Sequence, residues 1–312
     1  MRKIPFFNYP ALFEQRKDEY LKIIQDVLSR GAFIMQQDLI NFENELAKYL
    51  GVKHVIGVAD GTMALLTSLI AAGIKKGDEV IVSSHTFVAS AAAIHHAGAT
   101  PVLADCKSDH LIDPESIIKL ITPKTKAIMP VQLNGRVADM DAINKIAKEH
   151  KLIIIEDSCQ ALGAKYKNQF AGTFGLTGTF SFFPAKILGC FGDGGAVVTN
   201  NDDIAKKIRI IRDHGRDPND NKVNSFGFNS RLDNIQAAIL GFKLNYLDEV
   251  IVRRRKIASI YHSGLHHITQ LKLPPAPDSE TNHFDVFQNY EIEAEERDNL
   301  RVFLSDSGIG TI

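Results

Sequence analysis

Short apolar runs alternate with helical patterns between residues 54 and 157, and this alternation constrains the fold more than any other feature of the sequence. The runs are almost wholly apolar, as expected for strands that are covered on both faces. Short strands separated by helices form parallel βαβ units with right-handed crossovers. The expected strands are Val55–Val58, Glu79–Ser83, Pro101–Leu103, Ala127–Val131 and Leu152–Ile155, and the expected helices are Thr62–Ala72, Val88–His96, Pro114–Leu120 and Ala138–His150.

The flanking segments extend this α/β pattern. Strands Thr179–Phe183 and Ala196–Thr199 are joined without a long helix, which predicts a mixed sheet. Further helices are expected at Leu12–Arg30, Asp38–Leu50, Asp202–Arg212, Leu232–Ser263 (broken near Asp248) and Arg297–Asp306, with a strand at Phe287–Ile292. We expect a large domain over residues 1–240, with an N-terminal helical segment, and a small C-terminal α+β domain over residues 241–312. The sequence stops in a turn or new strand, which predicts that the small domain is truncated.

Charge and cysteine content exclude several classes of protein. The 36 basic and 37 acidic residues give a formal net charge of −1, which offers no support for nucleic-acid or membrane-surface binding. No run reaches the roughly 18 apolar residues of a membrane span, and no signal region follows the N-terminus. Cys106, Cys159 and Cys190 fit neither a disulfide framework nor a zinc motif. We therefore expect a cytoplasmic protein without a metal site.

One lysine and one aspartate indicate a chemistry. Lys186 follows an aromatic strand and precedes the glycine-rich turn Gly192–Gly195, and Asp157 ends an apolar strand. A lysine amine can bind the aldehyde of pyridoxal phosphate (PLP), and a carboxylate can keep the pyridine nitrogen protonated so that the ring accepts electrons. Each residue alone has a commoner reading, a solvated surface cation for Lys186 and a helix cap for Asp157. The occurrence of both residues together favours a PLP site over these two alternatives.

A phosphate site is expected close to this pair. Gly61 and Thr62 begin a helix directly after a strand, where backbone amides and the helix dipole favour an anion. Ser181, five residues before Lys186, can add its hydroxyl. The alternative is an ordinary helix start that is capped by Asp60.

Two further side chains are candidates for contacts with the pyridine ring. Phe87 follows a strand and can stack on a planar ring, although a single Phe is more often a core residue. Gln160 lies three residues after Asp157 and can bond a ring hydroxyl. The glycines match neither the dinucleotide fingerprint nor the P-loop, so nucleotide-binding folds of those types are rejected.

Many ordered motifs are shared with one enzyme family. They comprise Phe42-Glu43, Gly61-Thr62, Gly77–Ile81, Thr86-Phe87, Ala138–Asp141, Glu156-Asp157, Ser181–Pro184, Lys186, Gly194–Ala196, His214-Gly215, Asn229 and Arg231. In these motifs, between residues 31 and 310, the chain resembles the DegT/DnrJ/EryC1/StrS family of PLP-dependent sugar aminotransferases. The resemblance implies an aspartate-aminotransferase-like fold (PLP fold type I), with a large mixed-sheet domain and a small C-terminal domain.

The resemblance also implies a role for each matching residue. Lys186 would bind the cofactor and move protons, and Asp157 would pair with the pyridine nitrogen. Asn229 would reach the phosphate held by the neighbouring subunit, which implies a homodimer. The remaining implied contacts are Gly61, Thr62 and Ser181 at the phosphate, Phe87 against the ring and Gln160 near the ring oxygen.

One segment departs from the family pattern. Family members often carry Pro-Val-His-Leu-Tyr-Gly-Gln where this chain has Pro130–Arg136. Gln132, Asn134 and Arg136 are therefore expected at the substrate pocket, together with Arg231. Arg136 can favour a carboxylate or phosphate on the substrate, or it can cap a surface turn.

These patterns predict an aminotransferase that moves an amino group from an amino acid, L-glutamate by resemblance, to a nucleotide-linked keto sugar in amino-sugar biosynthesis. Three alternatives stay open: an acceptor that is a free keto-sugar acid or a cyclitol ketone, a PLP-dependent sugar dehydratase, and a non-catalytic regulatory protein on this fold. Relatives that dehydrate sugars resemble this chain with His in place of Lys186. The intact set Lys186, Asp157, Gln160 and Asn229 argues against a non-catalytic protein.

Overall fold

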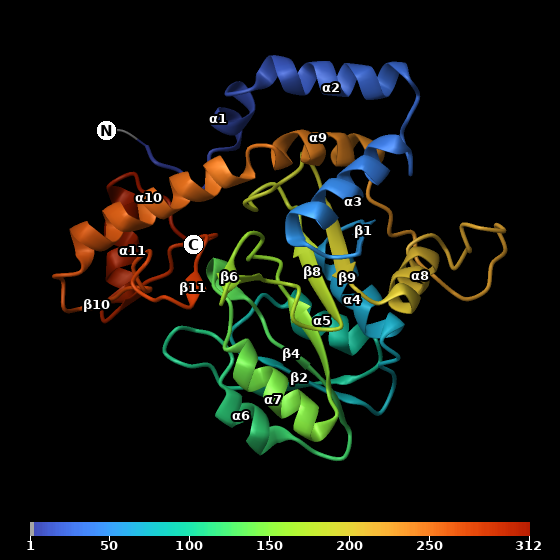
Figure 1. Cartoon of the computed structure of the whole chain (residues 1–312). Coiled ribbons are helices and arrows are strands. Elements are labelled where there is room, and N and C mark those ends of the chain that lie inside the picture. Colours follow the sequence, from blue (N-terminus) through green and yellow to red (C-terminus); the bar gives the residue numbers. More distant parts are fainter. Residues whose placement is uncertain (1–2) are drawn as a thin grey trace.

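The computed structural model describes residues 3–312, and its centre is a seven-stranded sheet (Figure 1). The strand order is β1-β9-β8-β5-β4-β2-β3. The strands are β1 (His54–Val58), β2 (Glu79–Ser83), β3 (Thr100–Ala104), β4 (Thr125–Met129), β5 (Ile153–Asp157), β8 (Thr177–Ser181) and β9 (Gly195–Thr199). β9 runs antiparallel to both of its neighbours, β1 and β8, and the other strand pairs of this sheet are parallel. The predicted α/β fold with a mixed, mostly parallel sheet is therefore confirmed.

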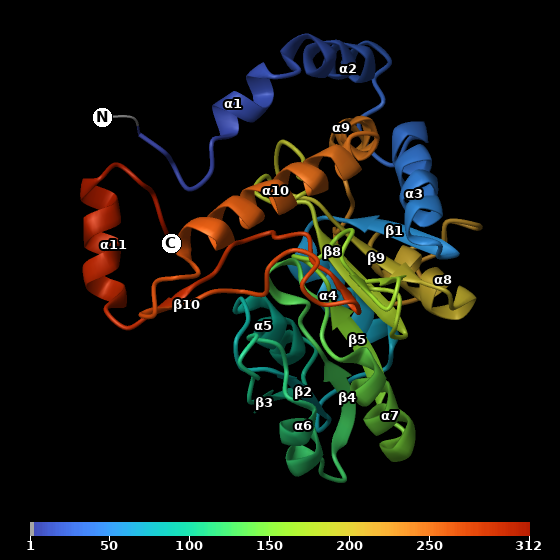
Figure 2. The same cartoon turned by 60° about the vertical axis from the view of Figure 1, so that its left-hand side comes forward.

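Helices cover both faces of the sheet. α4 (Gly61–Ala71) packs on β5, β8 and β9 and lies beside α5 (Ala89–His96) and α8 (Asp202–Ile211). α6 (Pro114–Leu120) and α7 (Met140–His150) form the opposite layer, and Figure 2 shows α5 and α7 on either side of the strands. Both layers exclude water from strand residues such as Ile81 and Ile155, which explains why the runs are wholly apolar.

The parallel strands end at a common edge of the sheet. β5 pairs in parallel with β4 and β8, and β4 pairs in parallel with β2. Their last residues are Ser83, Met129, Asp157 and Ser181. Because ligands of open α/β sheets bind beyond the carboxyl ends of the strands, this edge positions the candidate site.

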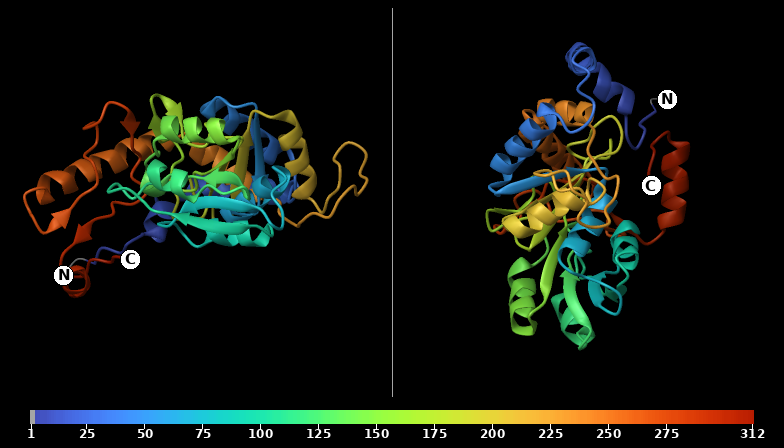
Figure 3. Two further views of the ribbon diagram at one scale, coloured as in Figure 1. Left: turned by 90° about the horizontal axis from the view of Figure 1, so that it is seen from below. Right: turned by 90° about the vertical axis from the view of Figure 1, so that its right-hand side faces the viewer.

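The first described residues and the C-terminal residues lie near each other at the periphery of the molecule, as Figure 3 shows. Ile4 and Ile309 form a parallel bridge. The flanking helices are α1 (Tyr9–Glu14), α2 (Lys17–Ser29), α3 (Gln37–Leu50), α9 (Asn234–Leu244), α10 (Leu247–Leu265) and α11 (Arg297–Asp306). Short strands complete this region: β10 (Leu271–Lys272) pairs with β12 (Glu293–Ala294), and β6 (Lys165–Tyr166) pairs with both β7 (Gln169–Phe170) and β11 (His283–Phe284).

Two long predicted helices are each divided in the structure: Leu12–Arg30, which the sequence predicts as continuous, and Leu232–Ser263, which it predicts to be broken near Asp248. The predicted helix Leu12–Arg30 is α1 and α2, because Arg16 has a non-helical backbone. The predicted helix Leu232–Ser263 is α9 and α10, with Tyr246 between them. The Arg16 guanidinium lies 3.5 Å from the centre of the Tyr246 ring, so a cation–π contact joins the two breaks.

The predicted strand Phe287–Ile292 is wrong. Phe287 has a φ of 52°, in the left-handed region that strands do not use. The neighbouring amides of Val286 and Gln288 donate to the carbonyls of Gly135 and Asn134, both at 2.9 Å, so this segment packs on a loop. The division of the chain near residue 240 stays a prediction. No helix within residues 3–312 is both long and apolar enough to cross a membrane.

Candidate active site

Asp157 ends β5, and its side chain is directed by two hydrogen bonds. Oδ2 accepts a bond from Ser90 Oγ at 2.6 Å, and Oδ1 accepts one from the Cys159 amide at 3.2 Å. The residue is only 5% exposed, and none of the ion pairs formed within residues 3–312 includes it. A buried carboxylate without a protein cation fits a protonated pyridine nitrogen, which would supply the missing charge.

Lys186 lies in the loop between β8 and β9, where its amide donates to the Phe183 carbonyl at 2.8 Å. Its side chain is close enough to the Cys159 thiol to affect it. Burial and the nearby Asp157 carboxylate raise the pKa of Cys159 well above its usual range, and the Lys186 charge opposes them. The charges of the lysine and the aspartate that the sequence pairs therefore both act on the pKa of one thiol.

The expected phosphate site is formed by segments far apart in the sequence. A Cβ added at Gly61 would lie 2.8 Å from Ser181 Cβ and 3.0 Å from Cys159 Sγ. No side chain larger than hydrogen fits there without displacing these neighbours. Gly61 therefore packs closely against Ser181 and Cys159, so two of the residues expected at the phosphate lie together at the start of α4.

The start of α4 has both an ordinary N-cap and backbone amides that favour an anion. Asp60 is the N-cap, and its Oδ1 accepts a bond from the Met63 amide at 2.8 Å. The amides of Gly61 and Thr62 precede the first intrahelical bonds and face the end of the helix, where an anion is favoured. A Cβ at Gly195 would lie 2.4 Å from the Asp60 carbonyl group, so the glycine-rich turn packs directly on this helix start.

Phe87 is not a core residue. It lies between β2 and α5 and is 69% exposed. Its carbonyl accepts a bond from the Ser90 amide at 3.1 Å, and Ser90 in turn bonds Asp157. An exposed aromatic ring beside the buried carboxylate fits a side chain that stacks on a planar ligand.

A hydrogen bond joins Gln160, three residues after Asp157, to Asn134 at the edge of a cavity. Gln160 Oε1 accepts a bond from the Asn134 amide at 2.8 Å. Asn134 belongs to the 3₁₀ turn η1 (Leu133–Gly135) and has a φ of 56°. It lines a cavity of about 670 Å³, and its side-chain amide bonds the Glu291 carboxylate and Asn289.

Gln132 is not at this cavity. It is fully buried, and its Oε1 accepts a bond from the Ala138 amide at 2.7 Å. Its Nε2 donates to Glu156 Oε2 at 2.9 Å. Because the amide is committed to these partners, the structure does not place Gln132 among the substrate contacts that the sequence analysis expected.

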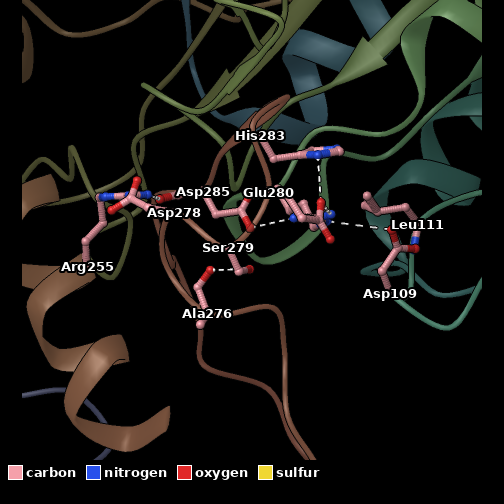
Figure 4. A network of polar contacts seen from close by, with 10 residues as sticks. Asp109, Leu111, Arg255, Ala276, Asp278, Ser279, Glu280, His283 and Asp285 are labelled. Carbon is pink, nitrogen blue, oxygen red and sulfur yellow. Dashed lines mark hydrogen bonds and ion pairs between the residues drawn. The ribbon is translucent and has the colours of Figure 1, made fainter. Parts of the chain in front are cut away.

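Arg136 lines the cavity but is surrounded by carboxylates. Figure 4 shows three of the acidic residues involved, Asp109, Glu280 and Asp285. Its Nη1 donates to Asp285 Oδ2 at 2.7 Å, its Nη2 bonds Glu280, and Asp109 lies 3.6 Å from Nε. Burial alone would lower the pKa of Arg136, but the Asp285 and Glu280 carboxylates raise it. The charge is thus neutralised within the chain. Arg136 joins the η1 loop to the C-terminal segment and does not cap a surface turn.

Asn229 and Arg231 lie on the segment that follows α8. Asn229 is exposed and forms an antiparallel bridge with Asp213. Arg231 Nη1 pairs with Asp213 Oδ1 at 3.2 Å. Between them Ser230 is fully buried, with Oγ 3.4 Å from the Ala59 amide. Figure 1 shows the loop before Asn229 projecting from the body.

One group of side chains in residues 3–312 has the chemistry of a metal site. Ligand atoms of His85, His110 and Glu291 all lie within 4.8 Å of one another, and imidazole and carboxylate are zinc ligands. His85 is exposed, and Glu291 already bonds Asn134. We treat the cluster as polar lining of the site, and the expected lack of a metal site stays a prediction.

Three supporting residues are not among the sequence predictions. Ser90 and Cys159 flank Asp157, and Gln288 bonds the backbone on both sides of Lys186. Ser90 has a weak sequence signal, because it lies one helical turn after Phe87. Gln288 has none, since its partners lie about a hundred residues away.

Comparisons with known proteins find relatives that match nearly the whole chain. A pleiotropic regulatory protein of Geobacillus stearothermophilus is 42% identical over 99% of this chain and 83% of its own length. A dTDP-3-amino-3,4,6-trideoxy-alpha-D-glucose transaminase of Streptomyces venezuelae is 41% identical over 99% of this chain and 81% of its own length.

Solved structures show the same relationship. The crystal structure of DesV from S. venezuelae, in complex with a ketimine intermediate, has a TM-score of 0.95 and 40% identity, and the match covers 99% of this chain and 82% of DesV. NtdA from Bacillus subtilis, with bound cofactor PMP, has a TM-score of 0.91 and 33% identity over 99% of this chain and 72% of its own.

The family itself follows from a match that extends over nearly the whole chain. The family model described as the DegT/DnrJ/EryC1/StrS aminotransferase family matches residues 14–312. The aspartate-aminotransferase-like fold that the sequence motifs imply is confirmed by the solved structures. The chain is a member of the DegT/DnrJ/EryC1/StrS aminotransferase family.

Proposed function

We propose that this aminotransferase uses PLP to move an amino group from L-glutamate to a nucleotide-linked keto sugar. The proposal is supported by two observations: Gly61, Ser181 and Cys159 lie together, and the charges of Lys186 and Asp157 both act on the pKa of the Cys159 thiol. PLP supplies an electron sink when it is bound. No metal takes part in the proposed reaction.

Each residue has a defined task in this proposal. Lys186 binds the cofactor covalently through its amine and, once released and neutral, moves a proton. Asp157 keeps the pyridine nitrogen protonated. The remaining contacts are Gly61, Thr62 and Ser181 to the phosphate, Phe87 stacked on the ring and Gln160 near the ring hydroxyl.

A dTDP-linked sugar is the first acceptor to test, because the S. venezuelae relative is named for such a substrate. Asn134 is the proposed contact to the acceptor, since it lines the cavity and lies one hydrogen bond from Gln160. Arg136 and Arg231 already have carboxylate partners, so they are not assigned to an anionic group. This arrangement weakens the case for a free keto-sugar acid.

We further propose a cytoplasmic homodimer in which Asn229 reaches the phosphate of the partner site. Asn229 is exposed on a segment that also carries Phe226, which is fully exposed, and Val223. An isolated subunit gains nothing from exposing such residues on a projecting loop, whereas a partner subunit can cover them.

A regulatory role is the second candidate, because the G. stearothermophilus relative is named a pleiotropic regulatory protein. The retained Lys186 and Asp157 favour catalysis, since a protein that only regulates has no use for a covalent cofactor site. A dehydratase is disfavoured because Lys186 is intact.

The test starts from purified protein that is mixed with PLP. A visible absorbance band of lysine-bound PLP should form, and L-glutamate should change it. Lys186→Ala should lose the band and at least about 10³-fold in kcat, whereas Lys145→Ala, an exposed lysine on α7, should match the wild type. Acceptors are then compared: keto sugars linked to dTDP, UDP or GDP, a free keto-sugar acid and a cyclitol ketone.

The outcomes separate the candidates. Protein that forms no band with PLP contradicts the proposal. PLP binding without amine transfer to any acceptor in the panel favours the regulatory role. Release of ammonia without an amino-sugar product favours dehydration.

A further inference from the structure

The side-chain amide of Gln288 bonds the backbone on both sides of Lys186. Oε1 accepts a hydrogen bond from the Ile187 amide at 2.9 Å, and Nε2 donates one to the Ala185 carbonyl at 2.9 Å. Gln288 is only 9% exposed, so water competes weakly for either bond. The two bonds restrict the backbone from which the Lys186 side chain extends.

Gln288 is itself held at both of its backbone groups. Its amide donates to the Asn134 carbonyl at 2.9 Å, and its carbonyl accepts a bond from Arg254 Nη1 at 3.0 Å. A Cβ at Gly135 would lie 2.9 Å from the Gln288 amide nitrogen, so glycine permits the close approach of the two segments. All four hydrogen-bonding groups of Gln288 therefore have partners.

Residues 182–194, which we call the lysine loop because they include Lys186, contain no helix or strand. The position of this loop therefore depends on such contacts. A second glutamine provides a matched case on the same loop. Gln236 Oε1 accepts a bond from the Phe191 amide at 2.9 Å, and its Nε2 donates to the Phe191 carbonyl at 3.3 Å. Gln236 therefore holds the loop five residues beyond Lys186, whereas Gln288 holds it at the lysine.

We propose that Gln288 is a positioning residue that sets the direction of the Lys186 side chain and couples it to the Asn134 loop at the substrate cavity. The inference rests on the proposed function. A lysine that both binds a cofactor and moves a proton must reach two different atoms. The backbone position from which its side chain extends therefore has to be fixed. Displacement of a reacting group by about 1 Å costs roughly 100-fold in rate.

The test compares Gln288→Met with Gln236→Met. Methionine keeps the length and apolar stem of glutamine but makes neither bond. In PLP-loaded protein, Gln288→Met should lower kcat by roughly 10- to 100-fold, leave KM for the acceptor within about twofold, and shift the pH titration of the visible absorbance band. Gln236→Met should change the kcat and the titration by less than about twofold, because its bonds lie away from the lysine.

A second variant and a second readout guard against misfolding. The Gln288→Asn side chain is still polar but is one methylene too short to make both bonds. This variant should therefore show a smaller decrease in kcat and a smaller shift in the titration than Gln288→Met. In PLP-free protein, amide hydrogen exchange at Ile187 should speed up at least about tenfold in Gln288→Met, while Gln236→Met should speed up exchange at Phe191 only.

The possible results are distinguishable. Both Gln288 variants matching the wild type in kcat and titration would overturn the inference, as would an equal effect of Gln236→Met. If the wild type binds no PLP, the proposed function fails, and exchange at Ile187 still tests the bonds of Gln288. Unchanged exchange at Ile187 in Gln288→Met rejects the role of Gln288 independently of the cofactor.

Discussion

Ser90 Oγ donates a 2.6 Å hydrogen bond to Oδ2 of Asp157, and both residues are buried. Ser90 belongs to the first turn of α5, so this bond joins a helix to the end of the central strand β5. Thr86 Oγ1 lies 2.7 Å from Ser90 Oγ and extends the contact to the Phe87 loop. The orientation of the carboxylate therefore depends on a hydroxyl that does not itself touch the cofactor in our proposal.

Ser90→Ala should lower kcat by roughly 10-fold, because hydrogen-bonded partners of a functional carboxylate or ligand contribute 10- to 100-fold to its performance. Without the hydroxyl, the Asp157 carboxylate loses its shortest bond and can rotate away from the pyridine nitrogen. Steady-state kinetics with L-glutamate and the keto-sugar acceptor give the kcat, and dialysis against PLP gives the cofactor affinity.

Ser68→Ala provides the control for that change. Ser68 is fully buried on α4, and its Oγ has no hydrogen-bond partner within the described part of the chain. Removing this hydroxyl should leave kcat unchanged and should not lower stability, since no bond is lost. An equal loss of kcat in both variants would mean that Ser90 acts only through packing.

Gly61→Ala should weaken PLP binding by at least about tenfold, or roughly 1.4 kcal/mol. The new methyl group would lie 2.8 Å from Ser181 Cβ and 3.0 Å from Cys159 Sγ, so it would push Ser181 and the start of α4 apart at the proposed phosphate site. Fluorescence titration of the PLP-free protein measures the dissociation constant.

The matched substitution is Gly264→Ala in α10. Nothing lies within 4 Å of the position of its Cβ, and its φ is not positive. Alanine should therefore stabilise the helix by up to about 1 kcal/mol and leave PLP affinity unchanged. A Gly61→Ala protein that binds PLP as tightly as the wild type would remove Gly61 from the phosphate site.

Lys186 and Asp157 could be named as candidate site residues from the sequence because their signal is local. Each lies at or just beyond the end of an apolar strand, and parallel strands bring such ends together without further information. The same reasoning located Gly61 and Ser181, which the structure places in contact range. The sequence allows Phe87 to be either a core residue or a ring that stacks on a ligand, and only its exposure in the fold excludes a core position.

The supporting contacts could not be predicted, because they depend on how distant segments pack. Ser90 and Asp157 are 67 residues apart, and Gln288 reaches Ile187 over 101 residues. Gln132 was expected at the substrate pocket from the motif that it interrupts. A motif does not reveal which way a side chain points, and Gln132 points into the interior toward Glu156.

The Cys159 thiol should be unreactive although it lies beside a lysine. Burial and the Asp157 carboxylate raise its pKa well above the usual range, and a one-unit rise leaves about tenfold less thiolate at a given pH. At pH 8, iodoacetamide should therefore alkylate Cys159 at least about tenfold more slowly in PLP-free folded protein than in urea. Peptide mass spectrometry follows Cys159 and Cys106 in the same sample, and equal rates in folded and unfolded protein would contradict the expected effect.

The pairing of Glu280 with Arg136 should stabilise the protein at pH values above the range in which carboxyl groups ordinarily titrate, and not at pH values below it. Burial alone would raise the pKa of Glu280, but the Arg136 guanidinium lowers it below the usual value of 4.5. A depressed folded-state pKa stabilises the protein above the unfolded-state pKa, and this contribution is lost as the pH falls through the folded-state value. Asp285 opposes this trend, since burial raises its pKa, although Arg136 lowers it.

Glu280→Gln isolates the Glu280 contribution because Asp285 and Arg136 remain. The difference in thermal midpoint between wild type and Glu280→Gln should be largest near pH 6 and should shrink as the pH falls below about 4.5. Glu295→Gln, at an exposed glutamate outside this network, should give no such pH dependence. A midpoint difference that stays constant from pH 6 to pH 3 would mean that the Glu280 carboxylate stabilises the fold through packing or uncharged hydrogen bonds, and that its charge beside Arg136 contributes nothing.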